Sequence, residues 1–261
     1  RELLSSYYDY YIEVMAFQKD RKTAELDLLK SLKSLFSITG NVQMSSVEDI
    51  IAQKFASIGW NFLGGITYPY FGPYIYEELE EKQFQVQLPN GIRNLPVKMM
   101  RKFHSLSWLD YSTFGVCGTG GWAKPDGLYC VIEKYDMASE KFQVSYLKHE
   151  AQHYDDYIRF PFLSNGFQEI LEYRAKLAEL IYSSSDLLFR RFMKEAKNDP
   201  EYPHLFASYQ ISQGFRKHAD LNHDNLSTQS IDVQKINEIA LLLFSENTKE
   251  LEKNCQDLIT S

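Results

Sequence analysis

The chain has few cysteines, no excess of positive charge and no long apolar run. Its three cysteines, Cys117, Cys130 and Cys255, are too few and too odd in number for a disulfide framework. Buried thiols are the simplest interpretation, with a pair between Cys117 and Cys130 as the alternative. A net charge of −7 argues against general binding to nucleic acid or to an anionic membrane. No apolar run approaches the length of a membrane span.

Nucleotide-binding loops are also missing. The glycine cluster at residues 115–122 lacks the Lys-Ser/Thr pair of a phosphate loop, and no Rossmann spacing is present. We expect this cluster to be a mobile or tightly turned loop at the rim of a cleft. The chain starts at Arg1 rather than Met, so we interpret it as a truncated or processed form, which leaves a secreted or cell-surface location open.

What the chain does have is the sequence His149-Glu150-Ala151-Gln152-His153. Residues four apart lie on one face of a helix, so two imidazoles at this spacing can point at one metal ion. Glu150 follows the first histidine and can sit beside the same ion without binding it. The apolar residues Val144, Leu147, Ala151, Tyr154 and Ile158 recur at intervals of three and four, as in an amphipathic helix. A solvated helix face or hydrogen-bonded core imidazoles would be the structural alternatives.

Two imidazoles leave a catalytic zinc site one protein ligand short. A second helix is predicted over residues 167–181, after a loop at residues 161–166. Glu169 and Glu172 lie one turn apart on this helix, and either reaches the histidines if the two helices pack antiparallel. Asp156, three residues after His153, is a further alternative for the third ligand.

This pattern resembles the gluzincin branch of the zinc metallopeptidases. In that branch the third ligand is a Glu on the next helix, often followed three residues later by Ala, and Glu172 with Ala175 matches both features. The resemblance implies that His149, His153 and Glu172 bind Zn²⁺ and that Glu150 is the general base. It also implies a zincin-like fold, in which a sheet packs on the active-site helix and an edge strand holds extended peptide.

The chain departs from the gluzincins in two places. Some members carry an Asp four residues after the ligand Glu, where it orients a ligand His, but that position here is Lys176. We therefore expect Glu169, Asp155 or Asp156 to support a ligand imidazole instead. The Gly-x-Met-x-Asn segment with which one aminopeptidase family grips a free amino terminus is also missing, so the resemblance implies no aminopeptidase specificity.

Gluzincins often stabilise the developing oxyanion with a Tyr or a His from the C-terminal region. The resemblance does not decide which residue does so here. The candidates are Tyr209, His218 and His223, with Tyr154 and Tyr157 nearer in sequence. Arg174 is expected to form a salt bridge on the helix surface, with a role in the electrostatics of the cleft as the alternative.

The periodicity of the chain predicts an α+β protein that is mostly helical. Phe84, Val86 and Leu88 alternate with glutamines, and Pro89-Asn90-Gly91 predicts a hairpin that returns through residues 92–100. Residues 126–135 predict another strand. We expect a small mixed or antiparallel sheet packed on the HExxH helix. The expected regions are a helical N-terminal region (1–70), a zincin-like core (71–183) and a helical C-terminal region (184–261), together forming one compact unit.

The sequence therefore predicts a zinc-dependent metallopeptidase that acts on peptides or proteins. The main alternative is a catalytically inactive zincin-like protein that binds peptide or metal. A helical interaction protein with an accidental motif is a third interpretation. The natural substrate, the choice between endopeptidase and exopeptidase action and the oligomeric state cannot be deduced from these residues.

Overall fold

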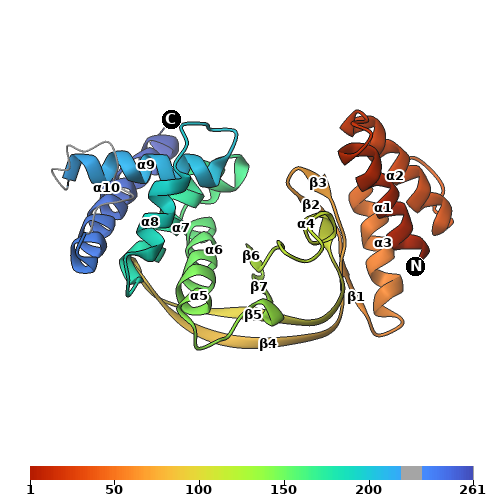
Figure 1. Ribbon diagram of the computed structural model, residues 1–261, viewed down its shortest axis with the longest axis horizontal. Coiled ribbons are helices and arrows are strands. Elements are labelled where there is room, and N and C mark those ends of the chain that lie inside the picture. Colours follow the sequence, from red (N-terminus) through yellow and green to blue (C-terminus); the bar gives the residue numbers. More distant parts are fainter. Residues whose placement is uncertain (219–230, 261) are drawn as a thin grey trace. The chain divides into compact units, whose positions relative to one another are not determined.

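The computed structural model describes residues 1–218 and 231–260, with the side chains of all of these except residue 165 and residues 256–260. It is an α+β protein with many helices and a small sheet, as the sequence predicts (Figure 1). Its contacts separate into two compact units. Unit 1 contains residues 1–80 and 99–120, and unit 2 contains residues 81–98 and the chain from residue 121 onward.

Unit 1 begins with three helices, which are α1 (Glu2–Met15), α2 (Arg21–Leu35) and α3 (Met44–Ala56). On α1 the buried residues recur at intervals of three and four, so one face of the helix enters the core. Asp20 caps α2 by accepting a hydrogen bond from the Thr23 backbone N–H at 3.0 Å. The buried residues of α1 are Leu3, Tyr7, Tyr10, Tyr11 and Val14.

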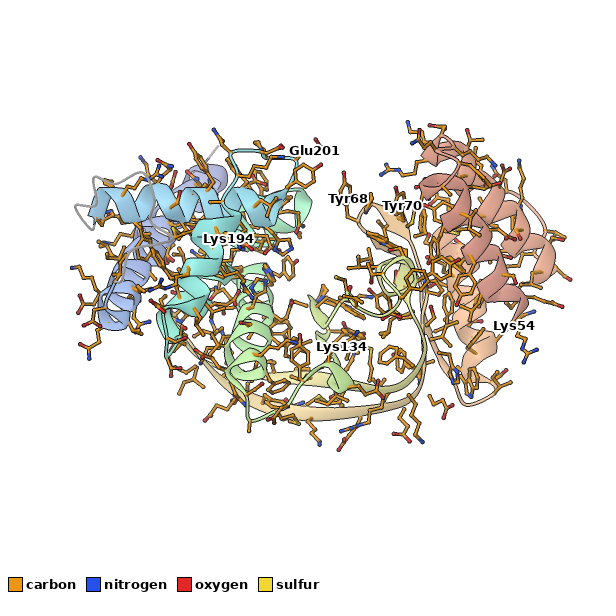
Figure 2. The ribbon with its side chains drawn as sticks, viewed as in Figure 1. Lys54, Tyr68, Tyr70, Lys134, Lys194 and Glu201 are labelled. Atoms are coloured by element: carbon orange, nitrogen blue, oxygen red, sulfur yellow. The ribbon has the colours of Figure 1, made fainter. Side chains whose placement is uncertain are left out.

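The rest of unit 1 consists of short strands and one short helix. Strand β1 (Asn61–Leu63) pairs antiparallel with the start of β4, and β2 (Ile66–Thr67) pairs with β3 (Tyr70–Phe71). Helix α4 (Ser107–Ser112) follows β5. The predicted connector at residues 64–73 therefore contains a small hairpin, which carries Tyr68 and Tyr70 (Figure 2).

The described strands form a five-stranded sheet in the order β1-β4-β5-β7-β6 and the separate β2–β3 pair. The predicted hairpin is present, but its strands β4 (Tyr74–Leu88) and β5 (Gly91–Leu106) are much longer than the alternating pattern suggests. Each unit takes part of both strands. Strands β6 (Gly121–Lys124) and β7 (Gly127–Val131) pair antiparallel in unit 2.

The helices of unit 2 pack around α7 (Gln168–Tyr182), which contacts α6 (His149–Arg159), α9 (Pro203–His218) and α10 (Val233–Thr260) (Figure 1). Helix α8 (Leu187–Glu195) packs mainly on α9. Strands β6 and β7 contact α6, so part of the sheet lies against the helix that carries the HExxH motif. Short turns connect these elements, namely η1 (Ile132–Lys134), α5 (Glu140–Phe142), η2 (Gln143–Lys148) and η3 (Pro161–Asn165).

Several expected boundaries differ from the structure. The two units do not follow the three expected regions, because β4 and β5 belong to both units and α8, α9 and α10 join the core around α7. The strand predicted over residues 126–135 ends at Val131, where the 3₁₀ turn begins. The expected loop at residues 115–122 ends in the first residues of β6.

No disulfide links Cys117, Cys130 or Cys255, and the simpler interpretation of the cysteines holds in that respect. Cys130 is buried as expected, whereas Cys117 is exposed and Cys255 is partly exposed. Among the residues that the structure describes, no helix is both long and apolar enough to cross a membrane.

Candidate metal centre

The HExxH motif begins α6, directly after a wide turn of π-helical type at Gln143–Lys148. Such turns are rare and are frequent at functional sites. The predicted apolar stripe is buried at Val144, Leu147 and Ala151. Burial of this stripe fixes the rotation of the helix about its axis, and it leaves His149 and His153 facing α7.

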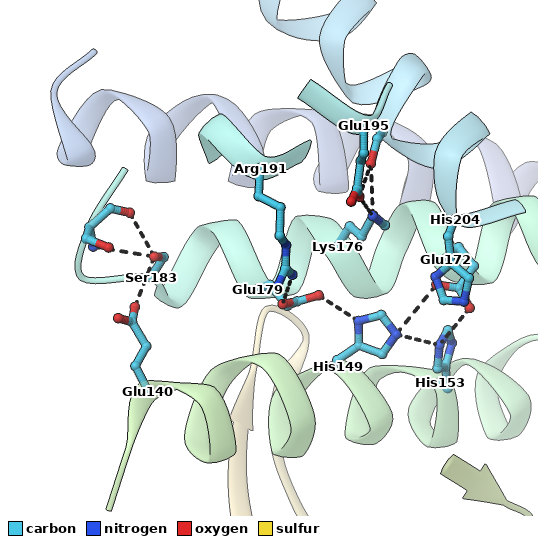
Figure 3. A network of polar contacts seen from close by, with 12 residues as sticks. Glu140, His149, His153, Glu172, Lys176, Glu179, Ser183, Arg191, Glu195 and His204 are labelled. Carbon is cyan, nitrogen blue, oxygen red and sulfur yellow. Dashed lines mark hydrogen bonds and ion pairs between the residues drawn. The ribbon is translucent and has the colours of Figure 1, made fainter. Parts of the chain in front are cut away.

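His149, His153 and Glu172 come together in unit 2 as the spacing predicts (Figure 3). The two histidine Nε2 atoms are 3.1 Å apart. His149 Nε2 lies 3.5 Å from Glu172 Oε2, and His153 Nε2 lies 3.5 Å from Glu172 Oε1. Each of the three residues is less than a tenth exposed. Two imidazoles and one carboxylate therefore converge on one buried point.

These separations suit a small cation. Ligand atoms about 2.0–2.1 Å from a tetrahedral zinc ion lie about 3.3 Å from one another, close to the observed values. Because Glu179 holds Nδ1 of His149, the hydrogen-bonding pattern leaves the Nε2 lone pair directed at the cluster. Glu172 is buried beside these imidazoles, and its Oε2 also lies 2.7 Å from His204 Nδ1. The residues present can thus hold a metal ion.

The charges around the cluster also favour a cation. Burial alone would lower the pKa of His149, but the hydrogen bond and charge of Glu179, with the charges of Glu172 and Glu150, raise it to about 9. Burial alone would raise the pKa of Glu172. Contacts with His153 and His204 outweigh this effect and hold its pKa well below the usual range. Both shifts show that the site stabilises positive charge beside an ionised Glu172.

Glu150 is half-buried on α6 beside the cluster. Burial raises its pKa, an effect that the charges of His149 and His153 partly oppose. No hydrogen bond or ion pair engages its carboxylate among the described residues, so the oxygens are available to a small molecule. A carboxylate with a raised pKa next to a metal site is suited to take up and return a proton.

Glu179 is the carboxylate that contacts the imidazole of His149, a candidate ligand, and it was not predicted from the sequence. Its Oε1 lies 2.8 Å from His149 Nδ1, and its side chain is almost fully buried. Glu179 follows Glu172 by seven residues, which is two helical turns, so both carboxylates lie on the same face of α7. The seven-residue spacing between Glu172 and Glu179 is the sequence pattern from which Glu179 could have been predicted. Lys176 instead pairs with Glu195 and Ser208.

His204 is the second residue that the sequence analysis missed. It lies in the first turn of α9, with Nδ1 2.7 Å from Glu172 Oε2, and it is mostly exposed. Its ring is nearly parallel to that of His149, with the ring centres 6.4 Å apart. No regular spacing in the sequence links His204 to the motif, because a loop and α8 intervene.

The acidic residues predicted to support an imidazole have other partners. Both oxygens of Asp156 accept hydrogen bonds from Arg174 at 2.9 Å, and among the described residues Asp156 forms no hydrogen bond or ion pair with His149 or His153. Asp155 pairs with Arg93. Glu169 forms no hydrogen bond or ion pair with either ligand imidazole among the described residues. The HExxH motif could not predict these partners, because it defines the spacing of residues along one helix and not their contacts with other helices and strands.

Arg174 is fully buried rather than at the helix surface as expected. Its guanidinium also donates to Asn247 and Thr248 on α10, each at 3.0 Å, and lies over the Phe244 ring at 4.2 Å. With Asp156 on α6, Arg174 therefore connects three helices of unit 2. Its role in this structure is to hold those helices together.

The described residues proposed as candidates for oxyanion stabilisation lie on different helices and have different neighbours. Tyr209 lies on α9 with its ring near Phe206, and His218 lies 3.6 Å from Glu246. His223 lies outside the described residues. Tyr157 is half-buried on α6, and its pKa is raised by burial and by the charges of Glu150 and Glu172, which places it near the cluster. Tyr154, three residues earlier, is also half-buried.

Comparisons with protein-family models, with curated proteins and with solved structures found no match to this chain.

Proposed function

We propose that this protein is a zinc-dependent peptidase with a zincin-like catalytic core in unit 2. The observation that carries the proposal is the convergence of His149, His153 and Glu172 with Glu150 beside them. Two imidazoles and a carboxylate form one of the recurring ligand sets of catalytic zinc, which leaves a position open for water or substrate. The proposed identity of the metal rests on this donor set, and the proposed fold on the contacts of β6 and β7 with α6.

In this mechanism His149, His153 and Glu172 would hold zinc, and Glu179 fixes the orientation of the His149 ring. When bound, zinc polarises a carbonyl group and lowers the pKa of water towards neutrality. Glu150 accepts a proton from the attacking water and returns it to the leaving amine of the cleaved peptide bond.

The substrate is proposed to bind along β6. This strand lies at the edge of the described sheet, and it contacts α6, the helix that carries the histidines. An extended peptide can add to such an edge through backbone hydrogen bonds, and side-chain pockets then provide the specificity. The proposed substrates are accordingly peptides or unfolded segments of proteins.

The decisive experiment compares the wild-type chain with Glu150→Gln and His149→Ala after reconstitution with zinc. We expect about one zinc ion per wild-type chain, retained in Glu150→Gln and lost in His149→Ala, measured by elemental analysis. Peptide hydrolysis should fall by at least about 100-fold in Glu150→Gln, because this variant loses only the base.

Two results of this experiment would contradict the proposed peptidase function. Zinc binding without hydrolysis of a broad peptide mixture by the wild type would reject the peptidase and leave a zincin-like protein that binds metal or peptide. No zinc binding in the wild type would reject both.

A further inference from the structure

A pocket of about 290 Å³ lies in unit 2 between β6 and the C-terminal half of α6. Its volume is close to the lower limit of roughly 300–1,000 Å³ for small-molecule sites, so it has room for one or two large side chains. The β6 side contributes Ala123, Lys124 and Pro125. The helical side contributes Tyr154, Tyr157 and Ile158, and the following turn adds Pro161 and Ser164.

The pocket is close to the candidate metal centre along α6. Tyr157 follows His153 by four residues, which corresponds to about 6 Å along the helix axis. The charges of Glu150 and Glu172 contribute to the raised pKa of Tyr157, after burial, which agrees with this proximity. In an extended peptide, side chains on the same face are about 7 Å apart. A peptide with its reacting bond at the cluster therefore places a nearby side chain at the pocket.

The walls of the pocket are mostly apolar. Proline rings, an alanine methyl group and the side chain of Ile158 form them, together with the two tyrosine rings. Ile158 is 58 % exposed although it is a large apolar residue, and it has polar neighbours in sequence. The hydroxyl of Ser164 already donates to the backbone oxygen of Pro161 at 2.6 Å. An apolar or aromatic side chain would cover this surface and exclude water from it.

Lys124 is the one lysine or arginine among the described residues that line the pocket, and its charge affects which substrate side chains can bind there. Lys124 is half-buried, its pKa is lowered by burial, and no carboxylate pairs with it among the described residues. The nearby Asp126 is engaged by Lys98 and by the Tyr129 hydroxyl. A second ammonium or a guanidinium in the pocket would lie near the charge of Lys124, which disfavours basic side chains, although the charge of Asp126 acts on Lys124 in the opposite direction. The net charge of −7 would by itself favour basic peptides, so the two effects oppose each other.

We propose that this pocket is the specificity subsite of the enzyme: it takes a large apolar side chain of the substrate, best an aromatic one, and rejects lysine and arginine. This inference rests on the proposed peptidase function and adds the class of substrate. Ile158 and Lys124 are the residues that determine the preference, Ile158 through apolar contact and Lys124 through charge.

The test uses the zinc-loaded full chain and short alanine-based peptides with a fluorophore and a quencher. One Phe is moved through the peptide position by position, with matched peptides that carry Lys or only Ala. At one position Phe should raise kcat/KM over Ala by about 10- to 200-fold, and Lys should not raise it. In Ile158→Arg the ratio of Phe to Ala should fall at least about tenfold. Leu187→Arg is the matched control, an exposed apolar residue of unit 2 outside the pocket, and should keep the ratio.

A binding experiment separates this inference from the proposed function. The zinc-loaded Glu150→Gln variant should bind the Phe peptide more tightly than the Lys peptide, and Ile158→Arg in that background should remove the preference. This result without any wild-type hydrolysis would support the subsite and reject the peptidase. Equal rates and equal affinities for the Phe, Lys and Ala peptides at every position, or a preference that survives Ile158→Arg, would overturn the subsite.

Discussion

At the scale of single residues, Glu179 has the clearest supporting role in the candidate centre. Its carboxylate lies 2.8 Å from Nδ1 of His149 and is almost fully buried. We expect Glu179→Gln to weaken zinc binding by about 10- to 100-fold, because the loss of its negative charge makes the His149 imidazole a poorer ligand. Competition with a chromogenic chelator measures this affinity.

Arg191→Ala is the matched control for Glu179→Gln. Arg191 is more than half exposed and lies 3.7 Å from Glu179 Oε2, so its removal leaves the His149 contact intact. Its effect on zinc affinity should be much smaller. A gain in zinc affinity in Arg191→Ala as large as the loss in Glu179→Gln would show that Glu179 acts only through the general charge of the region, because Arg191→Ala removes a positive charge.

The sequence predicted the residues that belong to one repeating geometry. His149, Glu150 and His153 share one helix, so their relation depends only on helical spacing. Glu172 required one further condition, the packing of α7 against α6, which the short loop favoured. His204 depends on where α9 begins in space, after a loop and another helix. No local pattern encodes that position, so it could not be predicted.

At the scale of elements, the packing of α6, α7 and α10 depends on a buried ion pair. Arg174 and Asp156 are both fully buried, and Arg174 Nε lies 2.9 Å from both carboxylate oxygens. Asp156→Asn would leave the guanidinium charge unpaired in the core. We expect this variant to lower the free energy of unfolding by about 3–5 kcal/mol, measured by urea denaturation.

Glu252→Ala is the control for Asp156→Asn, since it breaks the pair between Arg159 and Glu252, in which the Glu252 side chain is half exposed. Its expected cost is about 0–1 kcal/mol, because water solvates the remaining charge. Similar costs for the two variants would show that the buried pair contributes little beyond an ordinary surface contact.

A second element, α3, is fixed to unit 1 through Glu48, which is buried. Its Oε1 accepts hydrogen bonds from the Gly65 backbone N–H at 2.9 Å and from the Tyr7 hydroxyl at 3.3 Å. Burial raises the pKa of Glu48, and these two contacts only partly reverse the shift. The folded state therefore holds this proton more tightly than the unfolded state, so the stability from Glu48 is greatest below its unfolded pKa and is lost as the pH rises through its folded pKa.

Glu48→Gln keeps an oxygen that can accept both hydrogen bonds but has no titration. Relative to the wild type, the variant should therefore gain stability as the pH is raised from about 4 to about 7. Urea denaturation of both proteins at the two pH values provides the comparison. A difference in free energy of unfolding that stays constant with pH would contradict the assignment.

The elements themselves were predictable to different degrees. Helix α7, which has a clear apolar face, was predicted to within one residue at each end. The first half of β4 was missed because Glu77, Glu78, Glu80 and Glu81 are unfavourable in strands and hide the alternation that begins at Phe84. Pairing with β1, which sets the register of Tyr76 opposite Asn61, comes from a distant segment. The wide turn before α6 could not be predicted either, because the spacing of its apolar residues matches that of an ordinary α-helix.

At the scale of the whole molecule, the chain consists of two compact units that share β4 and β5. The periodicity of the sequence correctly indicated an α+β protein, but it gave no sign of the division. The two long strands run through both units, so neither unit is one continuous segment of the chain. Such a division depends on contacts between distant segments, which periodicity does not report.

This organisation predicts where zinc should stabilise the protein. All three candidate ligands belong to unit 2, so opening of α6 or α7 breaks the site, whereas opening of α1, α2 or α3 does not. A ligand at about 100 times its Kd adds about 2.7 kcal/mol to the states that bind it. Backbone amides of α6 and α7 should thus exchange more slowly with zinc, as measured by hydrogen exchange with mass spectrometry, and those of α1–α3 should be unchanged. His149→Ala should abolish the protection. Equal protection of both units would mean that zinc binds elsewhere or stabilises the whole chain at once.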